Sequence, residues 1–411
     1  MSKHFQKSVL LILDGLGDLP APLLGGSTPL EAANTPVMDH LAGSGLYGLV
    51  DPEKSGKVPN THTGCGTLLG VLPDVVNRLK RGPVEASGAG RDLKPGDIAI
   101  RANFCTLQEQ AGKLAVVDRR AGRIRTDTRE LAAALTPLDL GDGITAELIP
   151  TDQHRCVLVL SGPGLDPRVT DTDPGDSGMP GSVKNCLPKH DTADLTARKI
   201  NRFVHIAHQR LSRHPFNLAR IEAGQLPANG VITRGAGAGL ALENVVKDRG
   251  ISAALVAGCN TVIGLAKALG FEVITEPGFT ADIDTDLPAK MNAALAALER
   301  HDLVYIHIKA PDIFSHDQDP AGKKEFLERV DAALEILLQA DVNIAISADH
   351  STDCNTGAHT ADPVPALLYA ASGQGKKGSL VFGETACGGG TMPRQTGHMF
   401  LLRMLDLMAE T

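Results

Sequence analysis

The sequence of 411 residues predicts an α/β fold, in which a mostly parallel sheet is flanked by helices and a second α/β domain is inserted. Buried apolar runs at 9–14, 303–312 and 342–350 have the composition of strands in a parallel sheet. Amphipathic segments lie between such runs, which gives the strand, helix, strand order of α/β proteins. The stretch from about 75 to 280 is rich in turns and arginines, and we expect it to be the inserted domain.

The first strand is predicted at 9–14, VLLILD, directly after a short segment with positive charge. The run is too short to cross a membrane and ends at an aspartate, so we interpret it as a buried strand. The other two runs lead into Asp312 and Asp349. Because ligand sites of open α/β sheets lie at the carboxyl ends of the strands, Asp14 and these two residues are expected to converge.

Two segments are typical of the helices that cover such a sheet. TPLEAANTPVMDHL begins with the spacing Thr28-x-x-Glu31, which predicts a capping box at a helix N-terminus. KKEFLERVDAALEILL has apolar residues along one helical face, which predicts a helix packed on the sheet. The residues of that face are Phe326, Val330, Ala333 and Leu337.

The inserted domain is expected to span 75–281, which leaves a first domain of residues 1–74 and 282–411. The first domain must be discontinuous because the residues of metal-binding type lie before 70 and after 310. Hinges are therefore expected near 72–76 and 276–286.

Composition limits the classes of function. The net charge of -8 argues against binding of nucleic acid by the surface as a whole, whereas a local basic pocket could hold a small phosphorylated acid. The seven cysteines are dispersed without a C-x-x-C spacing, so neither a disulfide framework nor a structural zinc site is expected. We therefore expect a cytoplasmic protein without a membrane span, and composition does not predict its oligomeric state.

The segment VPNTHTGCGTLLGV, residues 58–71, places Thr61, His62 and Cys65 in a run punctuated by glycines. Glycine lets the backbone approach a neighbour closely, so this run can surround a ligand. Thr61 is either a turn residue or a nucleophile. His62 and Cys65 either face a substrate or are structural, and Cys65 could fill a small apolar gap.

Carboxylate and imidazole groups recur beside the predicted strand ends, in the segments DIFSH, SADH and GAHTADP. Each histidine taken singly could be structural. Together the groups suffice for two metals that share a nucleophile, and the mixture of ligands suits Mn²⁺ or Zn²⁺ better than Mg²⁺ or Ca²⁺. The candidate ligands are Asp14, Asp312, His316, Asp349, His350 and His359.

Several blocks occur together in one order: LILDGLGD, STPLEAANTPVMDHLAGSGLYG, PNTHTG, RANFCTL, VVDRRAGRI, HIKAPDIFSHD, SADHST and HTADPVP. Through these blocks the chain resembles, nearly end to end, the cofactor-independent (2,3-bisphosphoglycerate-independent) phosphoglycerate mutases. The resemblance is greatest to their archaeal-type branch, within the alkaline phosphatase superfamily. It implies an alkaline-phosphatase-like sheet, interconversion of 3-phosphoglycerate and 2-phosphoglycerate in glycolysis and gluconeogenesis, and no requirement for 2,3-bisphosphoglycerate.

The resemblance also implies residue roles. It implies two divalent metal ions, of which Mn²⁺ is expected, with Zn²⁺, Mg²⁺ and Co²⁺ as alternatives. Thr61 takes the position of a nucleophile that carries the phosphate as phosphothreonine, and Asp118 either handles a substrate proton or orients the arginines beside it. The implied metal ligands are Asp312, His316 and His359 for one ion and Asp14, Asp349, His350 and Thr61 for the other; the candidate substrate-binding residues are Arg119, Arg123, Arg101, Arg234 and His62.

The departures from the family pattern fall in the nucleophile segment. The family usually has serine where this chain has Thr61 and an acidic residue where it has His62, and the bacterial-type motif has histidine in place of Cys65. The extra methyl group of threonine restricts its rotamers and crowds an attack. Two alternatives therefore stay open. One is a related phosphotransferase or hydrolase that acts on a phosphonate or another phosphorylated acid, for example in a biosynthetic pathway, and the other is a catalytically silent binding protein.

Overall fold

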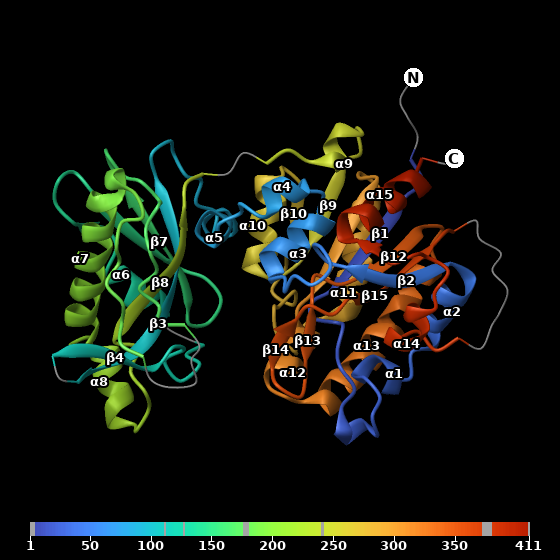
Figure 1. The fold of residues 1–411 in the computed structure, drawn as a ribbon, viewed down its shortest axis with the longest axis horizontal. Coiled ribbons are helices and arrows are strands. Elements are labelled where there is room, and N and C mark those ends of the chain that lie inside the picture. Colours follow the sequence, from blue (N-terminus) through green and yellow to red (C-terminus); the bar gives the residue numbers. More distant parts are fainter. Residues whose placement is uncertain are drawn as a thin grey trace. The chain divides into compact units, whose positions relative to one another are not determined.

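A computed structural model describes residues 5–110, 112–125, 128–175, 181–239, 242–371 and 380–409. The chain divides into two compact units, whose elements are labelled in Figure 1. Unit 1 consists of Met1–Leu79 and Leu242–Thr411, and unit 2 consists of Lys80–Ala241.

Unit 1 is built on an eight-stranded sheet of order β10-β9-β11-β1-β12-β15-β2-β16. Every neighbouring pair is parallel except those made by β15, which runs antiparallel to β12 and β2. The α/β class with a mostly parallel sheet is therefore confirmed. The strands are β1 (Ser8–Leu13), β2 (Leu46–Asp51), β9 (Ala253–Val256), β10 (Glu272–Ile274), β11 (Leu303–Ile308), β12 (Asn343–Ser347), β15 (Val364–Tyr369) and β16 (Gln395–Thr396), with a separate ribbon of β13 (Ser351–Asp353) and β14 (Ala358–Thr360).

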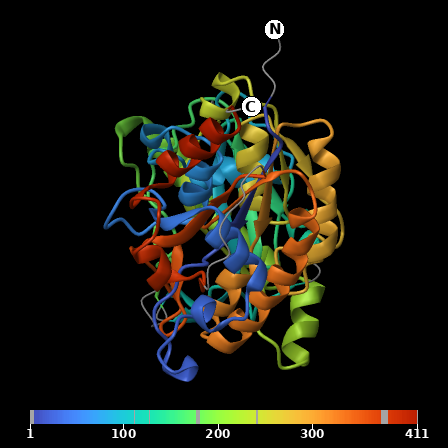
Figure 2. The ribbon, with the colours of Figure 1, turned by 90° about the vertical axis from the view of Figure 1, so that its right-hand side faces the viewer.

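Helices cover both faces of this sheet. In one layer α11 packs on α13, and α13 packs on α1 and α2; in the other, α3 packs on α10 and α15. Figure 2 shows the red helix α15 and the orange helix α11 on opposite sides of the sheet. The helices of unit 1 are η1 (Pro22–Leu24), α1 (Pro29–Ala32), α2 (Pro36–Ser44), α3 (Thr61–Leu68), α4 (Pro73–Val76), α9 (Val245–Asp248), α10 (Asn260–Ala268), α11 (Leu287–Leu298), α12 (Ala310–His316), α13 (Pro320–Leu338), α14 (Glu384–Gly388) and α15 (Gly397–Leu407).

Two predicted segments of unit 1 are interrupted at prolines. The capping box between Thr28 and Glu31 forms, but its helix ends at Ala32 and a second helix begins at Pro36. The run 303–312 is a strand only to Ile308, after which α12 begins. Proline lacks an N–H and has a fixed φ, so it suits the first turn of a helix and ends the extended segment before it.

Unit 2 contains a six-stranded sheet of order β4-β3-β7-β6-β5, with β8 paired to β3. All its pairs are antiparallel, so the expected second α/β domain is instead an antiparallel sheet with helices packed on it. Phe104 and Leu158 of the sheet pack with Phe203 of α7 in the main core, whereas α5 packs on the opposite face. The elements are α5 (Arg81–Gly88), β3 (Ile98–Gln110), β4 (Lys113–Asp118), α6 (Thr128–Ala133), β5 (Leu138–Asp139), β6 (Thr145–Pro150), β7 (Arg155–Ser161), η2 (Asp191–Ala193), α7 (Asp194–Leu211), α8 (Pro215–Glu222) and β8 (Gly230–Gly237).

The division into units differs from the expected boundaries at 74/75 and 281/282. The chain enters unit 2 after Leu79 and returns to unit 1 at Leu242. Residues 242–281 belong to unit 1 because β9 pairs in parallel with β11, with Leu255 opposite Tyr305, and β10 extends the same sheet. The second boundary therefore comes before these two short strands.

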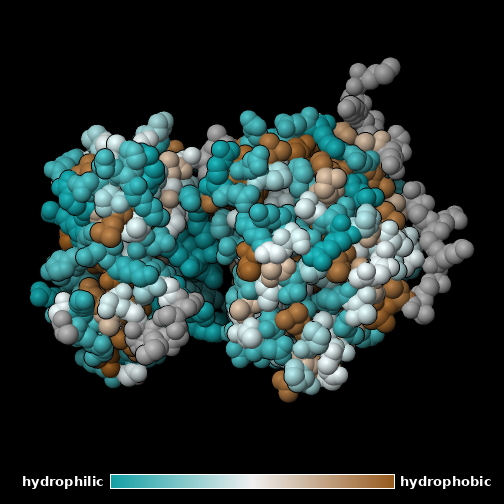
Figure 3. All heavy atoms as spheres, in the orientation of Figure 1, coloured by the Kyte–Doolittle hydropathy of each residue, from teal (hydrophilic) through white to brown (hydrophobic). Residues whose placement is uncertain are grey.

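Hydrophilic residues cover most of the face of each unit that is seen in Figure 3, with hydrophobic residues scattered among them. Across the described ranges, no helix combines the length and the apolar character that crossing a membrane would need.

Candidate metal centre and arginine cluster

Three carboxylates gather near the carboxyl ends of the central strands of unit 1. Asp14 directly follows β1, and Asp349 follows β12 by two residues. Asp312 was expected at a strand end, but it lies in the first turn of α12. All three are buried, and the exposed fraction of Asp14 and of Asp349 is 0%.

The hydrogen bonds of two histidines show which ring nitrogen donates. His316 Nδ1 lies 2.7 Å from the carbonyl oxygen of Gly357, and His359 Nδ1 lies 3.1 Å from that of Pro59. A carbonyl oxygen only accepts, so Nδ1 of each ring carries the proton. In the neutral form of each ring the lone pair is therefore on Nε2, and the two Nε2 atoms are 3.3 Å apart.

His350 is oriented in the same way by a hydroxyl group. Thr352 Oγ1 donates to Asp312 Oδ1 at 2.9 Å and lies 2.9 Å from His350 Nδ1. Since this hydroxyl proton goes to the carboxylate, Nδ1 of His350 is the donor to Thr352. A neutral imidazole whose Nδ1–H is bound by a neighbour presents Nε2 as a ligand, which is the usual arrangement at protein metal sites.

The three Nε2 atoms face the carboxylates. His316 Nε2 and His359 Nε2 lie 3.4 Å and 3.6 Å from Asp312 Oδ1. His350 Nε2 lies 3.2 Å from Asp14 Oδ1 and 3.3 Å from Asp349 Oδ2. Two groups of ligand atoms lie close enough to hold a metal ion, namely Asp312, His316 and His359, and Asp14, Asp312 and His350.

This donor set fits a divalent cation. It combines carboxylate oxygens with imidazole nitrogens, the mixture that suits Mn²⁺ and Zn²⁺. Asp349 Oδ2 is buried and finds no hydrogen-bond donor within the described part of the chain. The first group of ligand atoms equals one of the sets implied by the resemblance, whereas the second contains Asp312 where the resemblance implies Asp349 and Thr61.

Lys309 is a member of this cluster that the sequence analysis missed. Its Nζ lies 2.8 Å from Asp14 Oδ1, 2.5 Å from Asp312 Oδ2 and 3.4 Å from Thr61 Oγ1. Burial by itself would lower the pKa of Lys309, but the charges of the two aspartates hold that pKa above its usual value. The signal in the sequence was a lysine directly after a buried strand, one residue beyond Ile308.

The surroundings of two of the carboxylates shift their pKa values in opposite directions. Burial tends to raise the pKa of Asp14, but the Lys309 ammonium and a hydrogen bond from His307 hold it well below its usual range. His307 Nε2 lies 3.0 Å from Asp14 Oδ2 and was also missed from the sequence. For Asp349, burial and the charge of Asp14 raise the pKa well above its usual value. Such a gathering of buried charges is typical of a functional centre.

Thr61 is the first residue of α3, and it is 6% exposed. Its Oγ1 lies 3.4 Å from His350 Nε2. The approach of α3 to this cluster depends on Gly64, because a Cβ built there would lie 1.9 Å from the carbonyl oxygen of Asp349. Glycine is thus required for α3 to bring Thr61 against the segment that carries Asp349 and His350.

The other two residues singled out in the nucleophile segment differ in their surroundings. His62 follows Thr61 in the first turn of α3 and is partly buried. Cys65 is fully buried, and burial raises the pKa of its thiol well above the usual value. Cys65 is therefore an inert side chain of the core.

Unit 2 contains a second cluster, which is made of arginines. Arg101 of β3 lies opposite Arg234 of β8, and both face α5, which carries Arg81 and Glu85. Glu85 Oε1 lies 3.4 Å from Arg81 Nε and 3.9 Å from Arg101 Nε. α5 can come this close to the sheet because residue 82 is a glycine. A Cβ at this position would lie 2.1 Å from the carbonyl oxygen of Ala99.

Arg101 is the most constrained member of this cluster. It is 4% exposed, and its Nε and Nη1 atoms have no hydrogen-bond partner among the residues that the structure describes. Burial lowers its pKa well below the usual value, and the nearby charges of Arg81 and Arg234 lower it further. A buried guanidinium with unused donors is a site where an anion would bind.

The remaining candidates of unit 2 lie along the segment after β4. Asp118 ends that strand, and its Oδ1 accepts a hydrogen bond of 2.6 Å from Arg120 N. Arg119 forms a two-pronged pair with Asp173, at 3.0 and 2.6 Å. Arg123 has a positive φ of 55° and lines a cavity of ≈ 400 Å³ together with Arg220.

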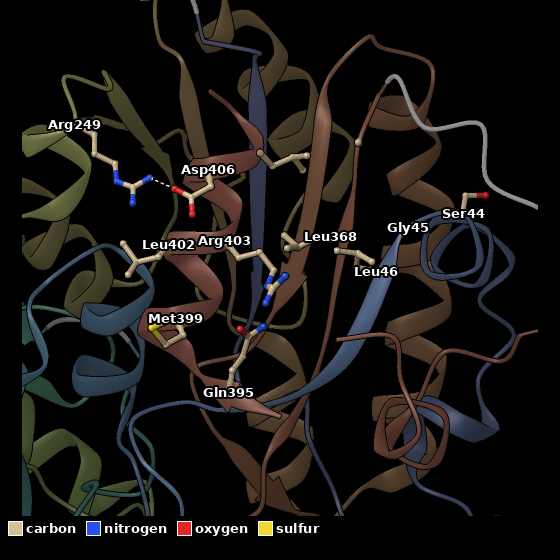
Figure 4. Close-up of a pocket in the computed structure, with 12 residues that line it drawn as sticks. Ser44, Gly45, Leu46, Arg249, Leu368, Gln395, Met399, Leu402, Arg403 and Asp406 are labelled. Atoms are coloured by element: carbon tan, nitrogen blue, oxygen red, sulfur yellow. Dashed lines mark hydrogen bonds and ion pairs between the residues drawn. The ribbon is translucent and has the colours of Figure 1, made fainter. Parts of the chain in front are cut away.

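A cavity of ≈ 620 Å³ in unit 1, drawn in Figure 4, has none of the candidate metal ligands among its lining residues. It is lined by Leu46 at the start of β2 and Leu368 near the end of β15, which pair with each other. Because β15 is antiparallel to β12, these residues lie near the amino ends of the parallel strands. Asp14 and Asp349 lie beyond the carboxyl ends of those strands, on the opposite side. In Figure 4, Arg249 and Asp406 pair with each other on its wall.

The chain is similar to known proteins along nearly its whole length. The family model described as the Metalloenzyme superfamily matches residues 6–405. A 2,3-bisphosphoglycerate-independent phosphoglycerate mutase from Ignicoccus hospitalis is 41% identical over 89% of this chain and 88% of its own length. One from Methanopyrus kandleri is 40% identical over 98% of this chain and 96% of its own length.

Two solved structures are similar along almost the whole chain. A protein from Pyrococcus horikoshii has a TM-score of 0.81 at 32% identity, covering 99% of this chain and 98% of that one. A cofactor-independent phosphoglycerate mutase from Thermoplasma acidophilum has a TM-score of 0.66 at 30% identity, covering 98% of this chain and 99% of that one.

Proposed function

Because the chain belongs to the Metalloenzyme superfamily and, within it, to the 2,3-bisphosphoglycerate-independent phosphoglycerate mutases, we propose that it interconverts 3-phosphoglycerate and 2-phosphoglycerate. The family resemblance found in the sequence is thus confirmed, and the protein is an enzyme of the isomerase class. We extend the proposal to a phosphothreonine intermediate on Thr61 and to a role in glycolysis or gluconeogenesis. A reducing cytoplasm is its proposed location, which is supported by seven buried free cysteines.

One observation carries the proposal. Three imidazoles, each with Nδ1–H bound by an oxygen acceptor, present Nε2 to a group of buried carboxylates beside the hydroxyl of Thr61. Two divalent cations held by the seven proposed ligands would lower the pKa of that hydroxyl, orient the phosphoryl group and neutralise the charge that develops on it. The proposed ion is Mn²⁺. The proposed ligands are Asp14, Thr61, Asp312, His316, Asp349, His350 and His359.

In the first step, Thr61 Oγ1 attacks the phosphorus atom of 3-phosphoglycerate. The bond from Oγ1 to phosphorus forms, and the bond from phosphorus to the oxygen on carbon 3 breaks. The threonine hydroxyl loses its proton, and the departing glycerate oxygen gains one, so protons and charge balance. In the second step the hydroxyl oxygen on carbon 2 of glycerate attacks the phosphorus of phosphothreonine, and the bond from Oγ1 to phosphorus breaks. The glycerate hydroxyl loses its proton and Thr61 Oγ1 regains one, which yields 2-phosphoglycerate.

Lys309 has two proposed tasks in this sequence of steps. Its ammonium lies 3.4 Å from Thr61 Oγ1, so it stabilises negative charge on that oxygen. Its bonds to Asp14 and Asp312 hold both carboxylates in place. Since Lys309 is buried against two charges, it stays protonated throughout the neutral pH range.

The arginines of unit 2 are the proposed site for the anionic groups of the substrate. Arg101 and Arg234 lie opposite each other on the neighbouring strands β3 and β8. Arg101 has buried donors without hydrogen-bond partners in the described ranges. A carboxylate or phosphate would accept these N–H groups and relieve the repulsion among the guanidinium groups. Arg119, Arg123 and His62 remain proposed substrate contacts.

Asp118 is proposed to exchange the proton of the glycerate hydroxyl. One of its oxygens accepts the backbone N–H of Arg120, which fixes the carboxylate and leaves the second oxygen for a substrate. Glycerate must reorient between the two steps without leaving, and water must be kept from the phosphothreonine, since hydrolysis would release free phosphate.

The test is incubation of the Mn²⁺-loaded protein with 3-phosphoglycerate, followed by phosphorus NMR. The proposal predicts 2-phosphoglycerate without added 2,3-bisphosphoglycerate, and loss of this activity on chelation. Free phosphate as the main product would identify a hydrolase. Absence of both products would show that the substrate is a different phosphorylated acid or a phosphonate, or that the protein binds without catalysis.

A further inference from the structure

Lys323 is a fully buried lysine whose role the proposed chemistry leaves open. It lies on α13 and is 0% exposed. Its ammonium donates to the carbonyl oxygen of Gly15 at 2.8 Å, to Asp18 Oδ2 at 2.7 Å and to Ser315 Oγ at 2.9 Å. All three donors of the ammonium group are therefore used, and Asp18 supplies the compensating charge.

Two of these contacts reach segments that carry proposed metal ligands. Gly15 follows Asp14, and the N–H of Gly15 donates to Asp349 Oδ1 at 3.2 Å. Ser315 lies on α12, directly before His316 and one turn after Asp312. The single ammonium group thus joins the segment that follows β1 to the helix that follows β11.

The partner carboxylate contacts the segment that follows His350. Asp18 Oδ1 accepts the N–H of Cys354 at 2.9 Å, at the end of β13. β13 begins directly after His350, and it pairs with β14 so that Thr352 lies opposite His359. Asp18 and Lys323 together therefore contact three segments, namely the one that follows β1, helix α12 and the end of β13, and the last of these pairs with β14, which carries His359.

We propose that the buried Asp18–Lys323 pair is a positioning element that sets the metal affinity of the centre, and this proposal rests on the proposed metal-binding function. A buried ion pair is weak evidence for stability, because an apolar pair of similar volume often folds as well. Its value here is geometric. It links three segments directly, and β14 through its pairing with β13, and the ligand atoms on these segments must agree within a fraction of an ångström for a metal to bind tightly.

The experiment compares the wild type with the double variant Asp18→Asn, Lys323→Met. The double variant removes both charges together, so it buries no uncompensated ion, and the amide oxygen of Asn still accepts from Cys354. What it loses is the link from α13 to Gly15 and Ser315. Ser315→Ala is a milder companion that removes one acceptor and tests the proposal if the double variant folds poorly.

The matched control is Lys199→Met in unit 2. Lys199 is also a buried lysine, 5% exposed, that donates to a backbone carbonyl, that of Leu140, and to a carboxylate, that of Asp142. Both of these partners belong to unit 2, whereas all the proposed metal ligands belong to unit 1. Mn²⁺ binding is measured from the EPR signal of the free ion, and thermal unfolding is measured on the metal-free protein.

We expect Mn²⁺ to bind about ten- to a hundredfold more weakly to the double variant, as for other groups that orient metal ligands. Ser315→Ala should weaken binding less, and Lys199→Met should leave it unchanged. Mn²⁺ binding by the double variant equal to that of the wild type would overturn the proposal, as would an equal weakening in Lys199→Met. Because no substrate is present, a wild type that binds Mn²⁺ but converts no 3-phosphoglycerate would count against the proposed function alone.

Discussion

Replacement of Arg101 by methionine should make the ligand-free protein more stable while it weakens substrate binding. Arg101 is buried beside Arg81 and Arg234, and two of its nitrogen atoms lack partners in the described ranges. Each unsatisfied buried polar group costs about 1–3 kcal/mol. Methionine fills a similar volume with the aliphatic part of the side chain, so it removes that cost and keeps most of the packing.

The Arg101→Met substitution removes few favourable contacts. The contact with Glu85 is long, at 3.9 Å, and Glu85 keeps Arg81 at 3.4 Å, so no carboxylate is left without a cation. We expect a net gain of about 1–2 kcal/mol in the free energy of unfolding of the ligand-free protein. For a unit of this size that corresponds to a rise in Tm of about 2–8 °C.

The assay has two parts, thermal unfolding without ligand and steady-state kinetics with 3-phosphoglycerate. Inorganic phosphate should raise the Tm of the wild type and have a smaller effect on Arg101→Met. The value of kcat/KM should fall about tenfold to a hundredfold, since a charged hydrogen bond to the substrate is worth roughly 1.5–3 kcal/mol. A lower Tm together with unchanged kcat/KM would refute the assignment of Arg101 to an anion site, because it would make Arg101 a purely structural residue.

Three further predictions concern unit 1. Thr61→Ala should lose turnover yet keep its fold and bound Mn²⁺, whereas Thr61→Ser should keep substantial activity; an active Thr61→Ala enzyme would exclude Thr61 as nucleophile. Gly64→Ala should lower the free energy of unfolding by about 2–4 kcal/mol, because its Cβ would lie 1.9 Å from the Asp349 carbonyl oxygen, and an unchanged urea midpoint would contradict this. Burial raises the pKa of Glu384 to about 7, so the folded state binds its proton more tightly than the unfolded state, and stability should fall as pH rises from about 4.5 through 7. In Glu384→Gln that fall should be smaller, and an identical pH profile of unfolding would show that Glu384 does not titrate there.

Much of the candidate metal centre could be predicted because its residues follow patterns that are local in sequence. Asp14 and Asp349 follow strongly apolar strands, and the strand-end rule for α/β sheets predicts that they meet. The two strands are indeed parallel neighbours. His316 and His359 carried no such signal on their own, and their proposed role came from the family resemblance.

What the sequence did not predict depends on contacts between distant segments. Lys309 resembles any lysine at the end of a strand, and only the fold shows that two aspartates surround it. The arginine cluster arises from the register of β3 and β8, which sets Arg101 opposite Arg234. The boundary of unit 2 was misplaced because β9 and β10 are only 4 and 3 residues long and carry little periodicity.

The measurement that tests the central claim most directly is an acid quench during turnover of 3-phosphoglycerate, followed by mass spectrometry of the peptides. The account predicts one phosphate on the peptide that contains Thr61, at the threonine itself, and none in the Thr61→Ala variant. Turnover to 2-phosphoglycerate with no phosphate on Thr61, or with phosphate on another residue, would contradict it.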